Sequence, residues 1–150
     1  MLISCERLRA LMPEFYSPVS SLHHYLHMAQ GNYKSYLRAK QVRIKKYFYV
    51  LRPIFACMWI ETEKTAPPME FEKLLDSQSI NRNLSNEIQK LLNRKRVGAE
   101  LGIGDRIKII DDFLIEKLSY FEEYSRKLKI RRNFNVKLLD SLFREQVSKE

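Results

Sequence analysis

Four residues in one predicted helix combine positive charge with an aromatic ring: Lys45, Lys46, Tyr49 and Arg52. Residues spaced by four and three share a helix face, so Lys45, Tyr49 and Arg52 lie together. Phosphate is bound by point charges and by the forked donors of arginine, whereas a nucleobase stacks on a flat ring. The pattern therefore predicts a phosphate-bearing ligand. Lys46 is either a second phosphate contact or an exposed lysine whose stem covers apolar surface.

Arg52 is the most informative of these residues because it interrupts the longest apolar run, residues 47–60. A charge within a buried helix is costly unless it is paired or faces a polar cavity. One interpretation is a contact with phosphate or substrate. The other is a salt bridge to a structural carboxylate.

Three histidines, His23, His24 and His27, do not form a convincing metal site. His23 and His27 are one helical turn apart, but His24 stands where a zinc protease would carry its glutamate, and no third ligand is identifiable. We therefore expect ordinary histidines that face solvent or are hydrogen-bonded, and we predict no metal ligands in the chain.

Acidic pairs are also present, but none has the setting that two-metal phosphoryl transfer needs. Such a site requires carboxylates fixed beside a phosphate-binding turn. No pair follows a glycine-rich turn or lies on a predicted strand, so we interpret all of them as helix-surface charge. The pairs are Asp111-Asp112, Glu122-Glu123 and Glu61-Thr62-Glu63.

The chain is strongly basic, with a formal net charge of +9 and a pI of about 9.6. A surface of this kind attracts polyanions such as RNA, nucleotides or anionic lipid, without selecting among them. The densest cluster, Arg94-Lys95-Arg96, is interpreted as a solvated helix end that complements the helix dipole. RNA contact is the alternative interpretation of this cluster.

The elements that must position these residues are predicted to be helices. The 150 residues are 45% hydrophobic and 30% charged, which indicates one globular domain, 1–150. Only 4 glycines and 5 prolines are present, few for a fold with frequent tight turns. No segment alternates convincingly as a strand does. We predict an all-α fold, an irregular bundle of about five to seven helices around a central apolar helix at about 43–63.

Hydrophobic residues at three- and four-residue steps give the remaining helices. Glycines at 98, 102 and 104 interrupt the chain, and basic residues at 127–132 separate the last two predicted helices. Apart from the central helix, the predicted helices are at about 2–12, 18–40, 71–75, 84–92, 107–121 and 136–147.

Cysteine use and hydropathy favour a cytoplasmic protein. Cys5 and Cys57 stand far apart and make neither a disulfide framework nor a metal site, so Cys57 is expected in the core of a protein from a reducing compartment. No basic segment followed by a long apolar one marks a secretory signal. The longest apolar run is shorter than the roughly 20 residues of a bilayer span, and we expect no membrane contact.

Several segments then occur in a recognisable order: HYLHMA at 24–29, KKYFYVLRP at 45–53, WIE at 59–61, and Pro67-Pro68 followed by Phe71 and Leu74-Leu75. Together they resemble the C-terminal half of bacterial predicted nucleotidyltransferases of the DNA polymerase beta superfamily, the type associated with RNA repair. The resemblance covers residues 17–95, and the segment from Lys45 to Pro53 is its most specific part. Beyond Gly98 the sequence matches only as generic helix.

The resemblance implies a mixed palm that holds Mg²⁺ and a nucleoside triphosphate, and a helical region that closes over the nucleotide or the acceptor. The reaction would transfer a nucleotidyl group to a hydroxyl. The palm's metal-binding signature is a Gly-Ser turn followed by Asp-x-Asp on a strand. This sequence contains neither Gly-Ser nor Asp-x-Asp. We therefore predict no catalytic residues in this chain, no activity alone, and no tight binding of Mg²⁺ or triphosphate by the chain alone.

Three functional hypotheses follow. In the first, the helical half binds a nucleotide or an RNA end, while a separate palm domain supplies catalysis. Lys45 and Arg52 would neutralise phosphate, Tyr49 would pack on a base or sugar, and Lys46 is either a second phosphate contact or a surface lysine. In the second, the chain is a non-catalytic basic helical module that binds RNA or a partner protein. In the third, it is an inactive product whose exposed palm-facing surface is covered in a homo-oligomer.

Overall fold

The computed structural model describes residues 17–98 and 101–148, and these residues are predominantly helical. This confirms the predicted all-α class, while the predicted helix at 2–12 lies outside the described residues. The described helices are α2 (Pro18–Tyr36), α3 (Lys46–Glu63), α4 (Phe71–Asp76), α5 (Arg82–Arg96) and α6 (Lys108–Ser148), and the strands are β1 (Gln41–Arg43) and β2 (Ile103–Asp105).

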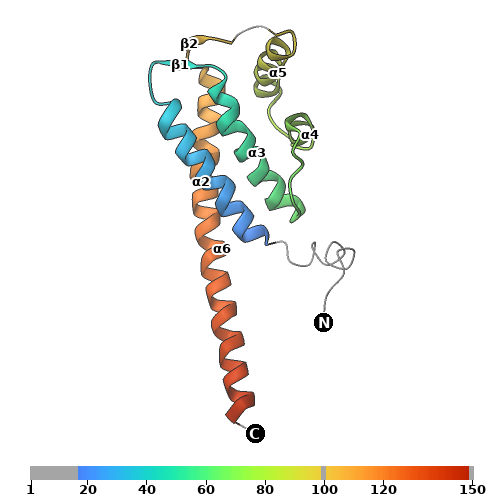
Figure 1. Ribbon diagram of the computed structural model, residues 1–150, viewed down its shortest axis with the longest axis vertical. Coiled ribbons are helices and arrows are strands. Elements are labelled where there is room, and N and C mark those ends of the chain that lie inside the picture. Colours follow the sequence, from blue (N-terminus) through green and yellow to red (C-terminus); the bar gives the residue numbers. More distant parts are fainter. Residues whose placement is uncertain (1–16, 99–100, 149–150) are drawn as a thin grey trace, which may run out of the picture.

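The helices form a bundle in which α2 and α3 pack side by side and α6 runs along both (Figure 1). On the side of α3 away from α2 lie α4 and α5, and α5 also contacts α6. With 41 residues, α6 is the longest helix, and its C-terminal half extends beyond the ends of α2 and α3 (Figure 1). Among the described helices, none combines the length and the apolar character that a bilayer span requires.

The first described helix, α2, begins as its sequence predicts. The Ser17 side chain accepts a hydrogen bond from the backbone N–H of Ser20 at 3.2 Å, and Pro18 follows in the first turn, where a missing N–H does no harm. The helix ends at Tyr36 rather than near residue 40. The chain then turns into β1, which starts at Gln41.

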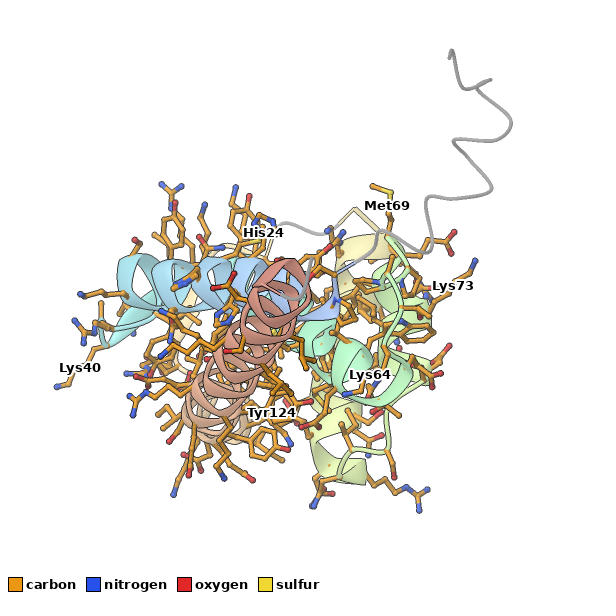
Figure 2. All side chains as sticks on the ribbon, turned by 90° about the horizontal axis from the view of Figure 1, so that it is seen from below. His24, Lys40, Lys64, Met69, Lys73 and Tyr124 are labelled. Atoms are coloured by element: carbon orange, nitrogen blue, oxygen red, sulfur yellow. The ribbon has the colours of Figure 1, made fainter. Side chains whose placement is uncertain are left out.

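The central helix is α3, and most of its circumference is buried, as predicted. It starts at Lys46, slightly later than the predicted 43, because the preceding residues form β1. Its C-cap, Lys64, has a left-handed backbone with φ of 58°. Beyond the helix end, the Lys64 ammonium donates to the hydroxyl of Tyr124 on α6 at 3.1 Å, and Figure 2 labels both residues.

The strand pair is a departure from the sequence-based prediction, which contained no strand. Antiparallel pairing joins β1 to β2 across the whole intervening chain of α3, α4 and α5. Three residues are too few for a two-residue alternation to be recognised, and only the central residue of β1, Val42, is buried. Opposite it, Gly104 packs closely, since a Cβ there would lie 3.4 Å from Ile44 Cδ1. The paired residues are Gln41 with Asp105, Val42 with Gly104 and Arg43 with Ile103.

The second departure concerns the end of the chain, where two helices were expected and one continuous helix is found. The predicted break at 127–132 is wrong, because the basic segment contains no glycine or proline that would stop a helix. Ion pairs one turn apart also support the helix where this segment begins: Arg126 pairs with Glu122 at 2.8 Å and Lys127 with Glu123 at 3.6 Å. These pairs place Glu122 and Glu123 on the helix surface, as predicted.

A buried polar cluster joins the start of α6 to α2 and α3. The Tyr47 hydroxyl donates to Asp111 Oδ1 at 2.9 Å, and Arg106 Nε donates to Asp111 Oδ2 at 2.9 Å. Arg106 also donates to the Tyr33 hydroxyl at 3.2 Å, and the Ile107 N–H donates to the Tyr47 hydroxyl at 2.8 Å. Tyr33, Tyr47, Arg106 and Asp111 are hereafter called the polar lock. They fix the angle at which α6 meets the other helices.

The polar lock corrects the interpretation of Asp111 as a surface charge. Asp111 is only 6% exposed, whereas its neighbour Asp112 is exposed as predicted. Burial raises the pKa of Tyr47 to about 12, and the bond to Asp111 adds to this while the bond from Ile107 opposes it. For Arg106, burial acts to lower the pKa, but the hydrogen bonds to Asp111 and Tyr33 outweigh it and raise the pKa. The lock is therefore held with Tyr47 neutral and Arg106 charged.

Candidate functional site

The four predicted site residues lie in and just before the N-terminal half of α3, on a strip of surface between α2 and α4. Lys45, Tyr49 and Arg52 are exposed, and Lys46 is half-buried. Because residues 45, 49 and 52 follow the exposed edge of an otherwise buried helix, their shared face opens to solvent. We call these four residues the α3 strip.

A cation and two aromatic rings meet at the α2 side of the strip. The Lys46 ammonium lies 4.1 Å from the ring centroid of Tyr49 and 4.2 Å from that of Tyr36. The two rings meet edge to face, with centroids 6.1 Å apart. Each contact of this kind contributes roughly 0.5–1 kcal/mol at an exposed position. Both rings stay about half exposed, Tyr36 at 41% and Tyr49 at 45%.

The backbone beneath this cluster is fixed by α2. Asn32 donates its side-chain N–H to the carbonyl oxygen of Tyr49 at 2.9 Å. This bond holds the two helices together where Tyr36 and Tyr49 approach each other. Sequence reasoning missed Tyr36, because its part in the cluster depends on how α2 packs against α3 and not on spacing within one helix.

Lys45 stands apart from this cluster. It occupies the N-cap position of α3, where its carbonyl oxygen accepts a hydrogen bond from the Phe48 N–H at 3.2 Å, and its side chain makes no hydrogen bond or ion pair with any described residue. Lys45 was predicted to contact phosphate, and Lys46 either to contact phosphate or to lie at the surface. The structure places Lys46 against the Tyr49 ring and leaves the Lys45 ammonium in solvent at the helix start.

Arg52 lies at the other side of the strip, next to α4. Its guanidinium is 3.4 Å from the carbonyl oxygen of Met69 and 6.0 Å from the Phe71 ring centroid. Within residues 17–98 and 101–148, no carboxylate forms an ion pair with Arg52. The described residues therefore do not contain the structural salt bridge that was the alternative interpretation of Arg52. The Arg52 side chain is exposed to solvent.

A pocket of about 450 Å³ adjoins Arg52 between α3, α4 and α5. Phe71 and Leu92 form its apolar part, and Lys95 and Arg96 bring two further cations from the end of α5. Glu70 and Glu72 also reach it, but each has a cationic partner: Lys73 at 3.5 Å for Glu70, and Arg96 for Glu72. Lys95 lies 5.3 Å from the Phe48 ring centroid of α3, which ties the end of α5 to the α3 strip.

The other candidates from the sequence stay apart from the strip. The rings of His23 and His27 stack with centroids 6.3 Å apart, and Figure 2 shows His24 at the surface of α2. In the part of the chain that the structure describes, no three His, Cys, Asp or Glu side chains gather as metal ligands would. Glu61 accepts a hydrogen bond from the Tyr120 hydroxyl, and this bond raises the pKa of Tyr120 to about 12.

Comparison with known proteins gives one family and one curated relative. The chain matches the RNA repair pathway DNA polymerase beta family over residues 3–145. YcgL of Bacillus subtilis (strain 168), an uncharacterized protein, is 43% identical over 129 residues, which cover 86% of this chain and 50% of YcgL. The chain therefore spans about half the length of this relative. No solved structure matches it significantly.

Proposed function

Because this chain belongs to the RNA repair pathway DNA polymerase beta family, we propose that it is the helical part of a nucleotidyltransferase and that its α3 strip binds the phosphates of a nucleotide or an RNA end. The observation that supports this most is the exposed Arg52, which has no carboxylate partner among the described residues. In the proposed complex, Arg52 and Lys46 neutralise phosphate, and Lys45 attracts it from the helix start. Tyr49 packs against a base or sugar.

We assign no catalytic step to this chain. Nucleotidyl transfer requires a hydroxyl to attack the α-phosphate of a triphosphate while pyrophosphate leaves, and Mg²⁺ supplies the charge stabilisation. The described residues do not fit a Mg²⁺ site, because their carboxylates do not gather. We propose that a palm domain with Gly-Ser and Asp-x-Asp holds the metal and the triphosphate. YcgL, which is about twice as long as the part that matches, has room for such a domain.

The contacts are strong enough for a measurable effect. A hydrogen bond to a charged group contributes roughly 1.5–3 kcal/mol, and stacking of one base on an aromatic ring roughly 1–3 kcal/mol. Since 1.4 kcal/mol corresponds to a factor of ten in affinity, removal of either Arg52 or the Tyr49 ring should weaken binding by about tenfold or more.

The test measures the affinity of the full chain for ATP by calorimetry, and for a short labelled single-stranded RNA by fluorescence anisotropy. Arg52→Ala and Tyr49→Ala should each weaken binding by about tenfold or more. Arg126→Ala is the matched control, because it removes a guanidinium that is 70% exposed on α6 and far from the strip in sequence. Equal losses in Arg52→Ala and Arg126→Ala would show that binding depends on net charge and not on the strip.

Salt dependence separates this proposal from a non-catalytic basic module. Delocalised RNA binding weakens by about one power of salt concentration per phosphate contact and should hardly respond to one substitution. A site on the α3 strip should bind one ligand and respond sharply to Arg52→Ala. Transfer of a labelled nucleotide to RNA by this chain alone, with Mg²⁺ present, would contradict the assignment of catalysis to a separate palm.

A further inference from the structure

The exposed face of α5 carries a row of carboxamide side chains. Asn83, Asn86, Gln89 and Asn93 line one pocket of about 580 Å³, which also touches α6. Their spacing of three, three and four residues keeps them on one side of the helix. The opposite side is apolar and packs into the core through Leu84, Ile88, Leu91 and Leu92.

These carboxamides are not used by the fold. No hydrogen bond joins the side chains of Asn86, Gln89 or Asn93 to another described residue. Each carboxamide offers two donors and one acceptor, and this combination matches the edge of a nucleobase. The fold therefore leaves a set of directional hydrogen-bonding groups facing outward.

The same helix is strongly basic. Its sequence, RNLSNEIQKLLNRKR, has five basic residues and one acid, a net of four positive charges. The acid, Glu87, pairs with Lys90 at 3.1 Å. Three of the basic residues, Arg94, Lys95 and Arg96, are exposed in the last turn, and Arg96 pairs with Glu72 of α4. A nucleic acid offers two kinds of group for contact, phosphates and base edges. The cations at the end of α5 suit the phosphates, and the carboxamides along its face suit the base edges.

We propose that α5 is a docking surface for single-stranded RNA, with its terminal cations on the phosphates and its carboxamide row on the base edges. The proposal deepens the function proposed above and rests on it for one point, which is that the end of the RNA lies at the α3 strip. The end of α5 lies close to the α3 strip. Arg52 of α3 shares a pocket with Lys95 and Arg96, and Lys95 lies 5.3 Å from the Phe48 ring.

The chemistry of α5 favours single-stranded RNA over the other polyanions. A membrane-binding helix needs an apolar face toward lipid, and that face of α5 is already buried in the bundle. Side chains cannot read the deep, narrow major groove of duplex RNA, whereas unpaired bases expose their edges. The aromatic stacking that single strands use is available from Tyr49 on the α3 strip and from Tyr36 beside it on α2.

The two kinds of contact can be separated by experiment. The probes are labelled single-stranded RNAs of about 12 nucleotides, one of A and one of U, bound to the full chain at several salt concentrations and followed by anisotropy. Arg94→Ala with Lys95→Ala should lower the salt slope by about 1.4, since neither side chain forms an ion pair with a described residue and each phosphate contact on a single strand contributes roughly 0.7. Asn86→Ala with Asn93→Ala should weaken binding about tenfold at one salt concentration, reduce any difference between the two RNAs, and leave the slope unchanged.

Matched controls lie on other helices. Arg126→Ala with Lys127→Ala removes two exposed charges from α6, and Gln30→Ala removes a carboxamide from α2. Neither should reproduce the effect of its counterpart on α5. Circular dichroism of every variant checks that the helices remain, so that a lost interaction is not confused with unfolding.

The outcomes also separate this inference from the proposed function. If the α5 variants bind both RNAs as the controls do, the α5 surface is refuted, while weaker ATP binding by Arg52→Ala would still support the α3 strip. Equal affinity for a duplex of the same length, or binding to anionic phospholipid vesicles with the same dependence on α5, would overturn the assignment to single strands. Weaker RNA binding with unchanged ATP affinity in the α5 variants is the result we expect.

Discussion

The polar lock predicts that two adjacent aspartates differ sharply in their effect on stability. Asp111 has a side chain that is 9% exposed and accepts hydrogen bonds from both Tyr47 and Arg106. Asp112 is exposed and forms no ion pair with a described residue. The perturbation is therefore Asp111→Asn, with Asp112→Asn as its matched control, because each removes one negative charge near the start of α6 and nearly preserves shape.

The magnitude follows from the contacts. An asparagine at 111 keeps one acceptor for Tyr47 but turns an N–H toward Arg106, which loses a charge-assisted bond of roughly 1.5–3 kcal/mol. Breaking a fully buried ion pair costs roughly 3–5 kcal/mol, but the Arg106 side chain is 30% exposed and can turn toward water, so the lower range applies. We expect a loss of about 2–3 kcal/mol for Asp111→Asn and less than about 0.5 kcal/mol for Asp112→Asn.

Urea unfolding followed by circular dichroism measures both losses, and thermal unfolding gives an independent check. For a chain of this size each kcal/mol lowers Tm by about 2–4 °C, so Asp111→Asn should melt about 4–12 °C lower. A double-mutant cycle of Tyr47→Phe with Asp111→Ala, which removes the acceptor, tests whether Tyr47 and Asp111 act together, with an expected coupling of about 1 kcal/mol. Losses in the two aspartate variants that agree within about 0.5 kcal/mol would refute the reasoning, since the lock would then add nothing beyond generic charge.

Three further predictions concern the core. Burial raises the pKa of Tyr47 from its ordinary value of 10.0 to about 12, so its contribution to stability is complete below pH 10 and is lost as pH rises through about 12. Tyr47→Phe should therefore reduce the fall in unfolding free energy over this pH range, and an unchanged fall would contradict the reasoning. Burial raises the pKa of the Cys57 thiol to about 12. In a Cys5→Ser variant, a thiol reagent should therefore react with Cys57 only as fast as the protein opens, and fast reaction without denaturant would disprove this. Phe55 is fully buried and contacts the Phe71 ring. Phe55→Ala should therefore destabilise the fold by about 3–5 kcal/mol in urea unfolding, and a loss under about 1 kcal/mol would be inconsistent with this packing.

The sequence predicted the parts of the fold that depend on local pattern. The central helix was recognisable because apolar residues cover most of its circumference, and the start of α2 because Ser17 and Pro18 cap it. The strand pair was not recognisable, because three residues carry no readable period and the partners are far apart in sequence. The continuity of α6 was missed because a basic segment was taken as a break although nothing in it stops a helix.

The candidate site divides in the same way. Spacing within one helix placed Tyr49 and Arg52 on a common face, and both are exposed there. Spacing could not reveal Tyr36, whose ring meets Lys46 only through the packing of α2 on α3. It could not reveal the burial of Asp111 either, because adjacent aspartates look alike until a neighbouring helix covers one of them. Whether the α3 strip binds a ligand stays a prediction.

The pairing of β1 with β2 has a consequence for the order in which the chain folds. It closes a loop over residues 44–102, and this loop holds both α3 and α5. Bringing the ends of such a loop together costs about 4 kcal/mol in chain entropy, recovered only when native contacts form at the junction. Tyr47 and Asp111 make such a contact beside the strands. We therefore expect the α2–α3 hairpin to form early and loop closure to limit the rate, so that Asp111→Asn should slow refolding in stopped-flow measurements. The α3 strip and α5 would then acquire their final relative position only in this last step.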